Sequence, residues 1–81
     1  MDEETVNAEI GILVEALKKV GYEEEGSFKA KFGDIFLETV DTLEALNGTL
    51  RAAKKRNIVL FKKQMLMQGV DNEEIVTLVK E

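Results

Sequence analysis

The sequence contains no cysteine and no histidine among its 81 residues, and its only serine is Ser27. Disulfides, thiolate metal sites, the commonest general base and the commonest metal ligand are therefore all missing. A Ser-His-Asp triad cannot be assembled either. Catalysis would have to rest on a pair of carboxylates alone. We therefore expect a protein that is not an enzyme and that uses no cofactor or metal.

Long apolar runs are missing as well. The longest span four residues, as in Ile58–Phe61, whereas a membrane-spanning helix needs about 20. The N-terminal residues Asp2, Glu3 and Glu4 are acidic, the reverse of the basic start of a signal peptide. We expect no membrane contact and a cytoplasmic location. The length predicts one domain over residues 1–81 with a thin core, and we expect a monomer.

Charge is spread unevenly along a chain whose formal net charge is −5. Residues 1–25 carry eight acidic side chains and two lysines, a net of −6. Residues 51–63 carry six basic side chains and no acid, a net of +6. Cations near a helix end are favoured by the helix dipole alone, but six in thirteen residues exceed that need. The pattern favours an acidic partner for this basic segment.

The first half of the chain predicts a helix, a strand and a second helix. Apolar residues recur at helical spacing over residues 6–20, and Gly21 is a natural left-handed helix stop. Residues 22–26 are expected to form a surface loop. Side chains alternate along Ser27–Lys31, which is typical of a strand. The spacing of Phe32, Ile35 and Phe36 then predicts a short second helix. We expect the aromatic side chains of Phe32 and Phe36 to lie in the core.

A third helix is predicted from the spacing of Leu43, Leu46, Leu50 and Ala53. Asp41 and Glu44 have the spacing of a capping box at its start, and Asn57 is a plausible C-cap. Gly48 falls inside this predicted helix, where glycine costs about 1 kcal/mol relative to alanine. We take this glycine as a sign that another backbone approaches closely.

The last part of the chain predicts a β-hairpin. Residues 64–68 alternate, with Met65 and Met67 on one face of the predicted strand and Leu66 on the other. Residues 74–79 are rich in β-branched side chains. Alternatively, residues 74–79 form a helix that is capped by Asp71. The whole order is helix, strand, helix, helix and hairpin. It predicts an α+β, winged-helix-like fold with three helices, a short strand and a C-terminal two-stranded hairpin.

Three segments carry a family resemblance. They are EALNGTLRAAKKR at residues 44–56, KFGDIF at residues 31–36 and MLMQGV at residues 65–70. Over roughly residues 28–79 the chain resembles the Costars family, whose members are small cytosolic proteins associated with the actin cytoskeleton and cell motility. They are similar to the C-terminal actin-binding domain of the striated-muscle activator of Rho signalling. The resemblance implies a winged-helix-like domain that binds actin or an actin-associated protein in a cytoskeleton-associated location.

The basic segment supplies the candidate partner-binding residues: Arg51, Lys54, Lys55, Arg56, Lys62 and Lys63. The FKKQ stretch at residues 61–64 departs from the family pattern and adds two of these charges. Phe61 and Met65 are candidate apolar anchors if they are exposed.

The sequence is compatible with two other functions. One is a winged-helix nucleic-acid-binding protein, which the basic third helix favours and the net charge of −5 opposes. The other is a protein–protein adaptor with no link to actin.

Overall fold

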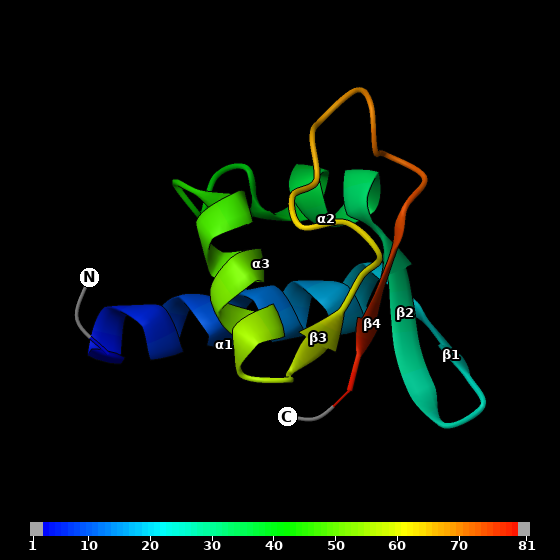
Figure 1. The fold of residues 1–81 in the computed structure, drawn as a ribbon, viewed down its shortest axis with the longest axis horizontal. Helices are drawn as coiled ribbons and strands as arrows, with labels where there is room; N and C mark the ends of the chain where they lie inside the picture. Colours follow the sequence, from blue (N-terminus) through cyan, green and yellow to red (C-terminus); the bar gives the residue numbers. More distant parts are fainter. Residues whose placement is uncertain (1–2, 80–81) are drawn as a thin grey trace.

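The computed structural model describes residues 3–79, and its longest element is the first helix (Figure 1). Helix α1 spans Glu3–Val20, with acidic residues in its first turn and lysines in its last, as the helix dipole favours. Ile10, Leu13 and Leu17 are buried along one side. The predicted first helix is confirmed. Asp2 lies outside the described residues.

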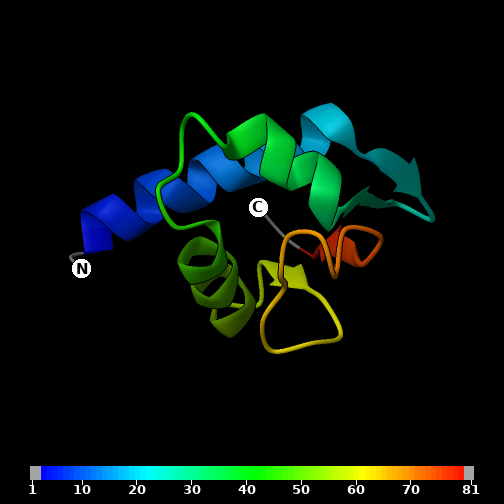
Figure 2. The same ribbon diagram turned by 90° about the horizontal axis from the view of Figure 1, so that it is seen from above.

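Two further helices and four strands complete the fold. In chain order after α1 they are β1 (Tyr22–Glu24), β2 (Ser27–Lys31), α2 (Phe32–Thr39), α3 (Leu46–Lys55), β3 (Val59–Leu60) and β4 (Ile75–Leu78). In Figure 1 α1 runs across the molecule, α3 crosses in front of it, and the sheet lies at its C-terminal end. Figure 2 shows from above that α2 and α3 lie against different parts of α1. Helix α1 contacts α2, α3 and β2, so it is the element around which the others pack.

The strands form one antiparallel sheet in the order β1-β2-β4-β3. Strand β4 pairs with β2 through Ala30 and Val76, and with β3 through Val59 and Leu78. The predicted strand at residues 74–79 is confirmed, and its helical alternative is wrong. The hairpin partner at residues 64–68 is wrong, because both sides of β4 are occupied by other strands. The residues at 64–68 lie instead in the loop between β3 and β4.

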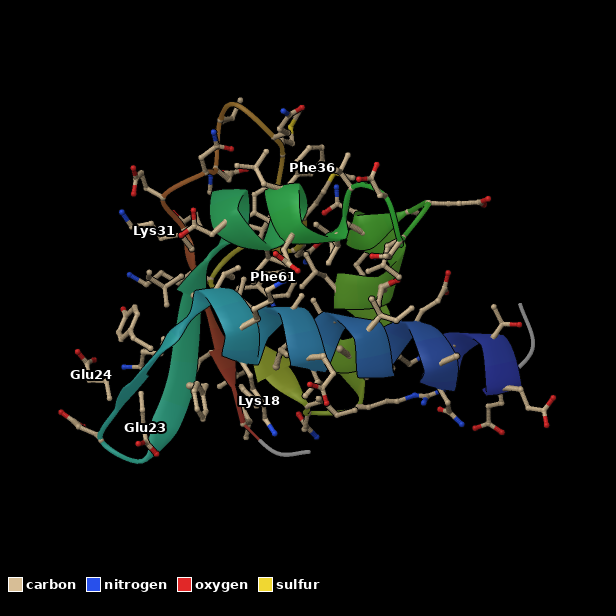
Figure 3. All side chains as sticks on the ribbon, turned by 180° about the vertical axis from the view of Figure 1, so that it is seen from behind. Lys18, Glu23, Glu24, Lys31, Phe36 and Phe61 are labelled. Carbon is tan, nitrogen blue, oxygen red and sulfur yellow. The ribbon has the colours of Figure 1, made fainter. Side chains whose placement is uncertain are left out.

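The segment at residues 22–26 is partly a strand rather than a loop. Residues Tyr22–Glu24 form β1 and pair with β2. The reversal between the two strands occurs at Glu25 and Gly26, whose φ angles of 53° and 84° both lie in the left-handed region. The glycine accepts this conformation at little cost. The run of three glutamates thus lies at an exposed hairpin (Figure 3).

Helix α3 begins later than the capping box predicts. Its N-cap is Ala45, with no side-chain cap, and both Asp41 and Glu44 are exposed. The backbone N–H groups of Thr42 and Leu43 instead donate to the carbonyl of Thr39, at 3.0 and 2.8 Å, so residues 40–43 turn at the end of α2. The predicted cap is therefore wrong.

Helix α3 ends one residue earlier than predicted: its C-cap is Arg56, and the predicted cap Asn57 is the next residue. Asn57 has a φ of 60°, the left-handed conformation that terminates many helices. Its N–H donates to the carbonyl of Lys54 at 3.0 Å, and the next N–H, of Ile58, donates to Ala53 at 2.9 Å. These two bonds satisfy carbonyls that the helix itself leaves free.

Gly21 and Gly48 play roles different from those predicted. Gly21 has no positive φ, so it is not a left-handed stop. A Cβ at this position would lie 2.4 Å from the carbonyl oxygen of Lys29 and 2.5 Å from that of Leu17. Gly21 is therefore needed for the close approach of β2 to the end of α1. Gly48, for which a close backbone was expected, has only the Cβ of Ala45, at 3.8 Å, near such a position.

The core lies between α1, the other two helices and one face of the sheet. Its fully buried side chains include Leu13, Phe32, Ile35, Leu50 and Val76. The α+β class with three helices is confirmed, whereas the winged-helix designation stays a prediction. No helix within residues 3–79 has the length and apolar character needed to cross a membrane.

Candidate functional site

Lys54 holds the loop that follows β3. Its Nζ donates to the carbonyl oxygens of Phe61 and Lys63, both at 2.9 Å, and lies 4.4 Å from the centre of the Phe61 ring. A cation over an aromatic face is favoured by the charge distribution of the ring. Phe61 is buried, and Figure 3 shows it within the body of the molecule, behind the helices nearest the viewer. It is therefore not an exposed anchor, and Lys54 already has internal partners.

Arg56 joins the end of α3 to the beginning of α1. Its Nη1 donates to Oδ1 of Asn7, and its Nη2 lies 3.9 Å from Oε1 of Glu3. Both contacts link residues about fifty positions apart in the chain. The charge of Arg56 is thus part of the helix packing, although its side chain remains partly accessible.

Lys63 neutralises the buried carboxylate of Asp71. The Lys63 Nζ donates to Asp71 Oδ1, and the Asp71 side chain is only 4% exposed. The other oxygen, Oδ2, accepts the N–H of Met67 at 2.8 Å. A buried charge is tolerated when it is paired and hydrogen-bonded in this way. Asp71 therefore ties both ends of the 63–71 segment together.

These contacts set opposite pKa shifts for the two residues. The hydrogen bond from Lys63, aided by the bond from the Met67 N–H, holds the pKa of Asp71 below its ordinary value of 3.8. The hydrogen bond to Asp71, aided by its charge, raises the pKa of Lys63 above 10.5. A lowered carboxyl pKa stabilises the fold above pH 3.8, and this contribution is lost as pH falls through the folded-state value.

We therefore expect Asp71→Asn to lower the denaturation midpoint at pH 7 and to flatten its acid dependence. Urea unfolding from pH 7 to pH 2 measures both effects. The difference between the two proteins should be constant above about pH 5 and should shrink below pH 3.8, because protonation removes the same charge from the unmodified chain. Parallel curves over the whole range would contradict the assigned role of Asp71.

Arg51, Lys55 and Lys62 are different from the other three cations. All three are exposed, and none forms an ion pair or hydrogen bond through its side chain with any residue of the described part of the chain. Arg51 and Lys55 lie one turn apart on α3. Lys62 lies between the two residues whose carbonyls Lys54 holds, so its backbone is fixed beside α3. We call Arg51, Lys55 and Lys62 the free cations.

The glutamates of the β1–β2 hairpin lie away from α3. Figure 3 places Glu23 and Glu24 at the β1–β2 hairpin, and Figures 1 and 2 both show this hairpin on the far side of the sheet from α3. The sheet order explains the separation, because β1 and β3 are its two opposite edges and α3 lies next to β3. The glutamates at residues 23–25 are thus kept apart from the basic segment, whereas Glu3 at the start of α1 lies beside Arg56.

The loop between β3 and β4 was not predicted, because residues 64–68 were assigned to a hairpin strand. Leu66 is fully buried, while its neighbours Met65 and Met67 are 52% and 54% exposed. Side chains hold the loop backbone: Asn47 Oδ1 accepts the Leu66 N–H at 3.2 Å, and Asn72 Oδ1 accepts the Gly69 N–H at 2.9 Å. The sequence signal for this loop is its Gly, Asn and Asp content, which favours turns.

The chain is similar to known proteins over almost its whole length. The family model for Costars matches residues 5–79. A Costars family protein ABRACL of Xenopus tropicalis is 43% identical over 77 residues, covering 90% of this chain and 95% of the relative. A Costars family protein of Oryza sativa subsp. indica is 46% identical over 77 residues, covering 90% and 88%.

A solved structure gives the same result in three dimensions. The solution structure of human HSPC280 protein superposes with a TM-score of 0.84 at 35% sequence identity, covering 94% of this chain and 93% of that one. The matched region includes all three helices and the four strands. Family motif, sequence identity and backbone geometry agree over this region, and the chain belongs to the Costars family.

Proposed function

We propose that the protein is a non-enzymatic regulator of the actin cytoskeleton that binds an acidic surface on actin or on an actin-associated protein. Membership of the Costars family is consistent with an actin-related role. The observation that carries the proposal is the set of free cations, three exposed charges beside one helix with no internal partner in the described residues. Opposite charge on a partner speeds encounter and sets the orientation of docking.

The other three basic residues support this surface rather than form it. Lys54 and Lys63 hold the loop that carries Lys62, and Arg56 joins α3 to α1. Their replacement would disturb the fold together with any interface. A test of binding therefore has to spare them.

The test is the triple variant Arg51→Glu, Lys55→Glu, Lys62→Glu. We expect at least a tenfold loss of cosedimentation with actin filaments, or of capture of purified actin-binding proteins, because three attractive charges become repulsive. Binding by the unmodified chain should also weaken as salt rises from 50 to 200 mM. Circular dichroism and thermal unfolding verify that the variant is folded.

A matched control reverses three other lysines: Lys19→Glu, Lys29→Glu, Lys31→Glu. This control changes the net charge by the same amount, but on α1 and β2, where the native lysines form exposed ion pairs with Glu38, Glu24 and Glu73. Such pairs contribute little to stability. Equal binding by the unmodified chain and the free-cation variant, with both folded, would rule the surface out. Equal loss in both variants would reduce the effect to net charge alone.

A further inference from the structure

A shallow groove lies along the exposed side of α3. It has a volume of about 660 Å³ and is bounded by α3, by Val6 near the start of α1 and by Gln64 in the loop. Its lining combines the small residues Gly48 and Ala52 with the cations Arg51 and Lys55. We call this space the α3 groove. It brings together three segments that are distant in sequence.

Gly48 has no internal explanation. Its φ is not left-handed, and a Cβ there would meet only the Cβ of Ala45 at an ordinary 3.8 Å. Glycine in a helix interior is unfavourable relative to alanine, so the position gives up stability without relieving strain or admitting another part of the described chain. Gly48 lines the α3 groove, so the absent side chain leaves space there.

The charge of the α3 groove is of one sign. Among residues 3–79 its lining includes Arg51, Lys54 and Lys55 and no carboxylate. Lys54 is occupied by the loop carbonyls, whereas Arg51 and Lys55 have no partner within residues 3–79. An occupant that places carboxylates against these two side chains would neutralise them, and a basic occupant would be repelled.

The backbone of α3 favours a helical occupant over an extended one. Its N–H and C=O groups are used within the helix, so the groove offers an extended chain no row of backbone partners. An extended peptide would bury its own backbone groups unpaired, whereas a helix satisfies them internally. Small residues at a helix crossing also permit close approach of two helices.

We propose that the α3 groove binds an acidic amphipathic helix of a partner protein. Apolar side chains of that helix pack on Gly48, Ala52 and Val6, and its carboxylates pair with Arg51 and Lys55. The inference rests on the proposed function, because it gives a structure to the acidic partner surface postulated there. It does not depend on the partner's link to actin.

The test uses a displayed library of 16-residue helical peptides, varied on one face and selected on the immobilised full chain. Recovered peptides are titrated by fluorescence anisotropy against the unmodified chain, Gly48→Met and the control Gly11→Met. Gly11 is also an exposed helical glycine with no heavy atom within 4 Å of an added Cβ. Both substitutions replace glycine by a better helix former, so both should raise the melting temperature.

Only Gly48→Met should weaken binding, by at least tenfold, because its side chain fills the α3 groove. The recovered peptides should be acidic, with apolar residues at i, i+3 and i+4 spacing. Basic or neutral peptides, equal binding to Gly48→Met, or no recovered binder would overturn the proposal. So would self-association of the chain that Gly48→Met abolishes, since a second copy would then be the occupant. A helix that binds here while actin and its binding proteins do not would refute only the actin-linked proposal.

Discussion

Replacing Gly21 by alanine is expected to lower the free energy of unfolding by about 3 kcal/mol, the upper end of the usual cost of overpacking. The added Cβ would lie 2.4 Å from the Lys29 carbonyl oxygen and 2.5 Å from that of Leu17. Both are backbone atoms, so neither can rotate away, and α1 and β2 would have to separate. For a chain of this length the total stability is about 4–12 kcal/mol, so the variant should unfold at a much lower urea concentration.

Gly11→Ala is the control for the Gly21 substitution. It places the same methyl group in open space within α1, the helix that ends just before Gly21, and should stabilise the protein by about 0.5–1 kcal/mol. Urea unfolding followed by circular dichroism gives both values. A Gly21→Ala variant whose stability lies within 0.5 kcal/mol of the unmodified chain, a margin of about the size typical of surface substitutions, would refute the tight α1–β2 contact.

Leu66→Ala is expected to cost about 2–5 kcal/mol, the range for removing a buried leucine side chain. Leu66 is fully buried although it lies in a loop, and it joins that loop to the core. Met65→Ala is the control, because Met65 is half exposed and its loss should change stability by about 0.5 kcal/mol or less.

Amide hydrogen exchange would show where the Leu66 substitution acts. We expect faster exchange at the Leu66 and Met67 N–H groups, which are bonded to Asn47 and Asp71, since local opening then requires less free energy. Similar stability losses for Leu66→Ala and Met65→Ala would mean that the loop is not anchored through Leu66.

Local patterns predicted several elements well. Helix α1 and strand β2 follow from periodicity, and the predicted cap Asn57 lies one residue beyond the C-cap of α3. The alternation at residues 64–68 separated buried Leu66 from exposed Met65 and Met67 correctly. The alternation could not show whether residues 64–68 pair with β4. They do not, because β2 and β3 occupy both sides of β4.

Non-local contacts explain the remaining differences. The basic segment appears uniform in sequence, yet three of its six charges have partners that lie 7 to 49 positions away. No periodicity within residues 51–63 contains that information. The two glycines illustrate the same limit, since the crowding at Gly21 comes from Lys29 and the space at Gly48 is a property of the folded surface.

The position of β4 has a consequence for how the protein is made. This strand is the last of the described elements in the chain but an inner strand of the sheet, flanked by β2 and β3. A ribosome therefore has to deliver everything up to Leu78 before β2 and β3 can be joined. Until then β3 and the loop that follows it have no sheet partner, although α1, α2, α3 and β2 can already pack on one another. Folding should therefore be slow relative to that of helical proteins of this size.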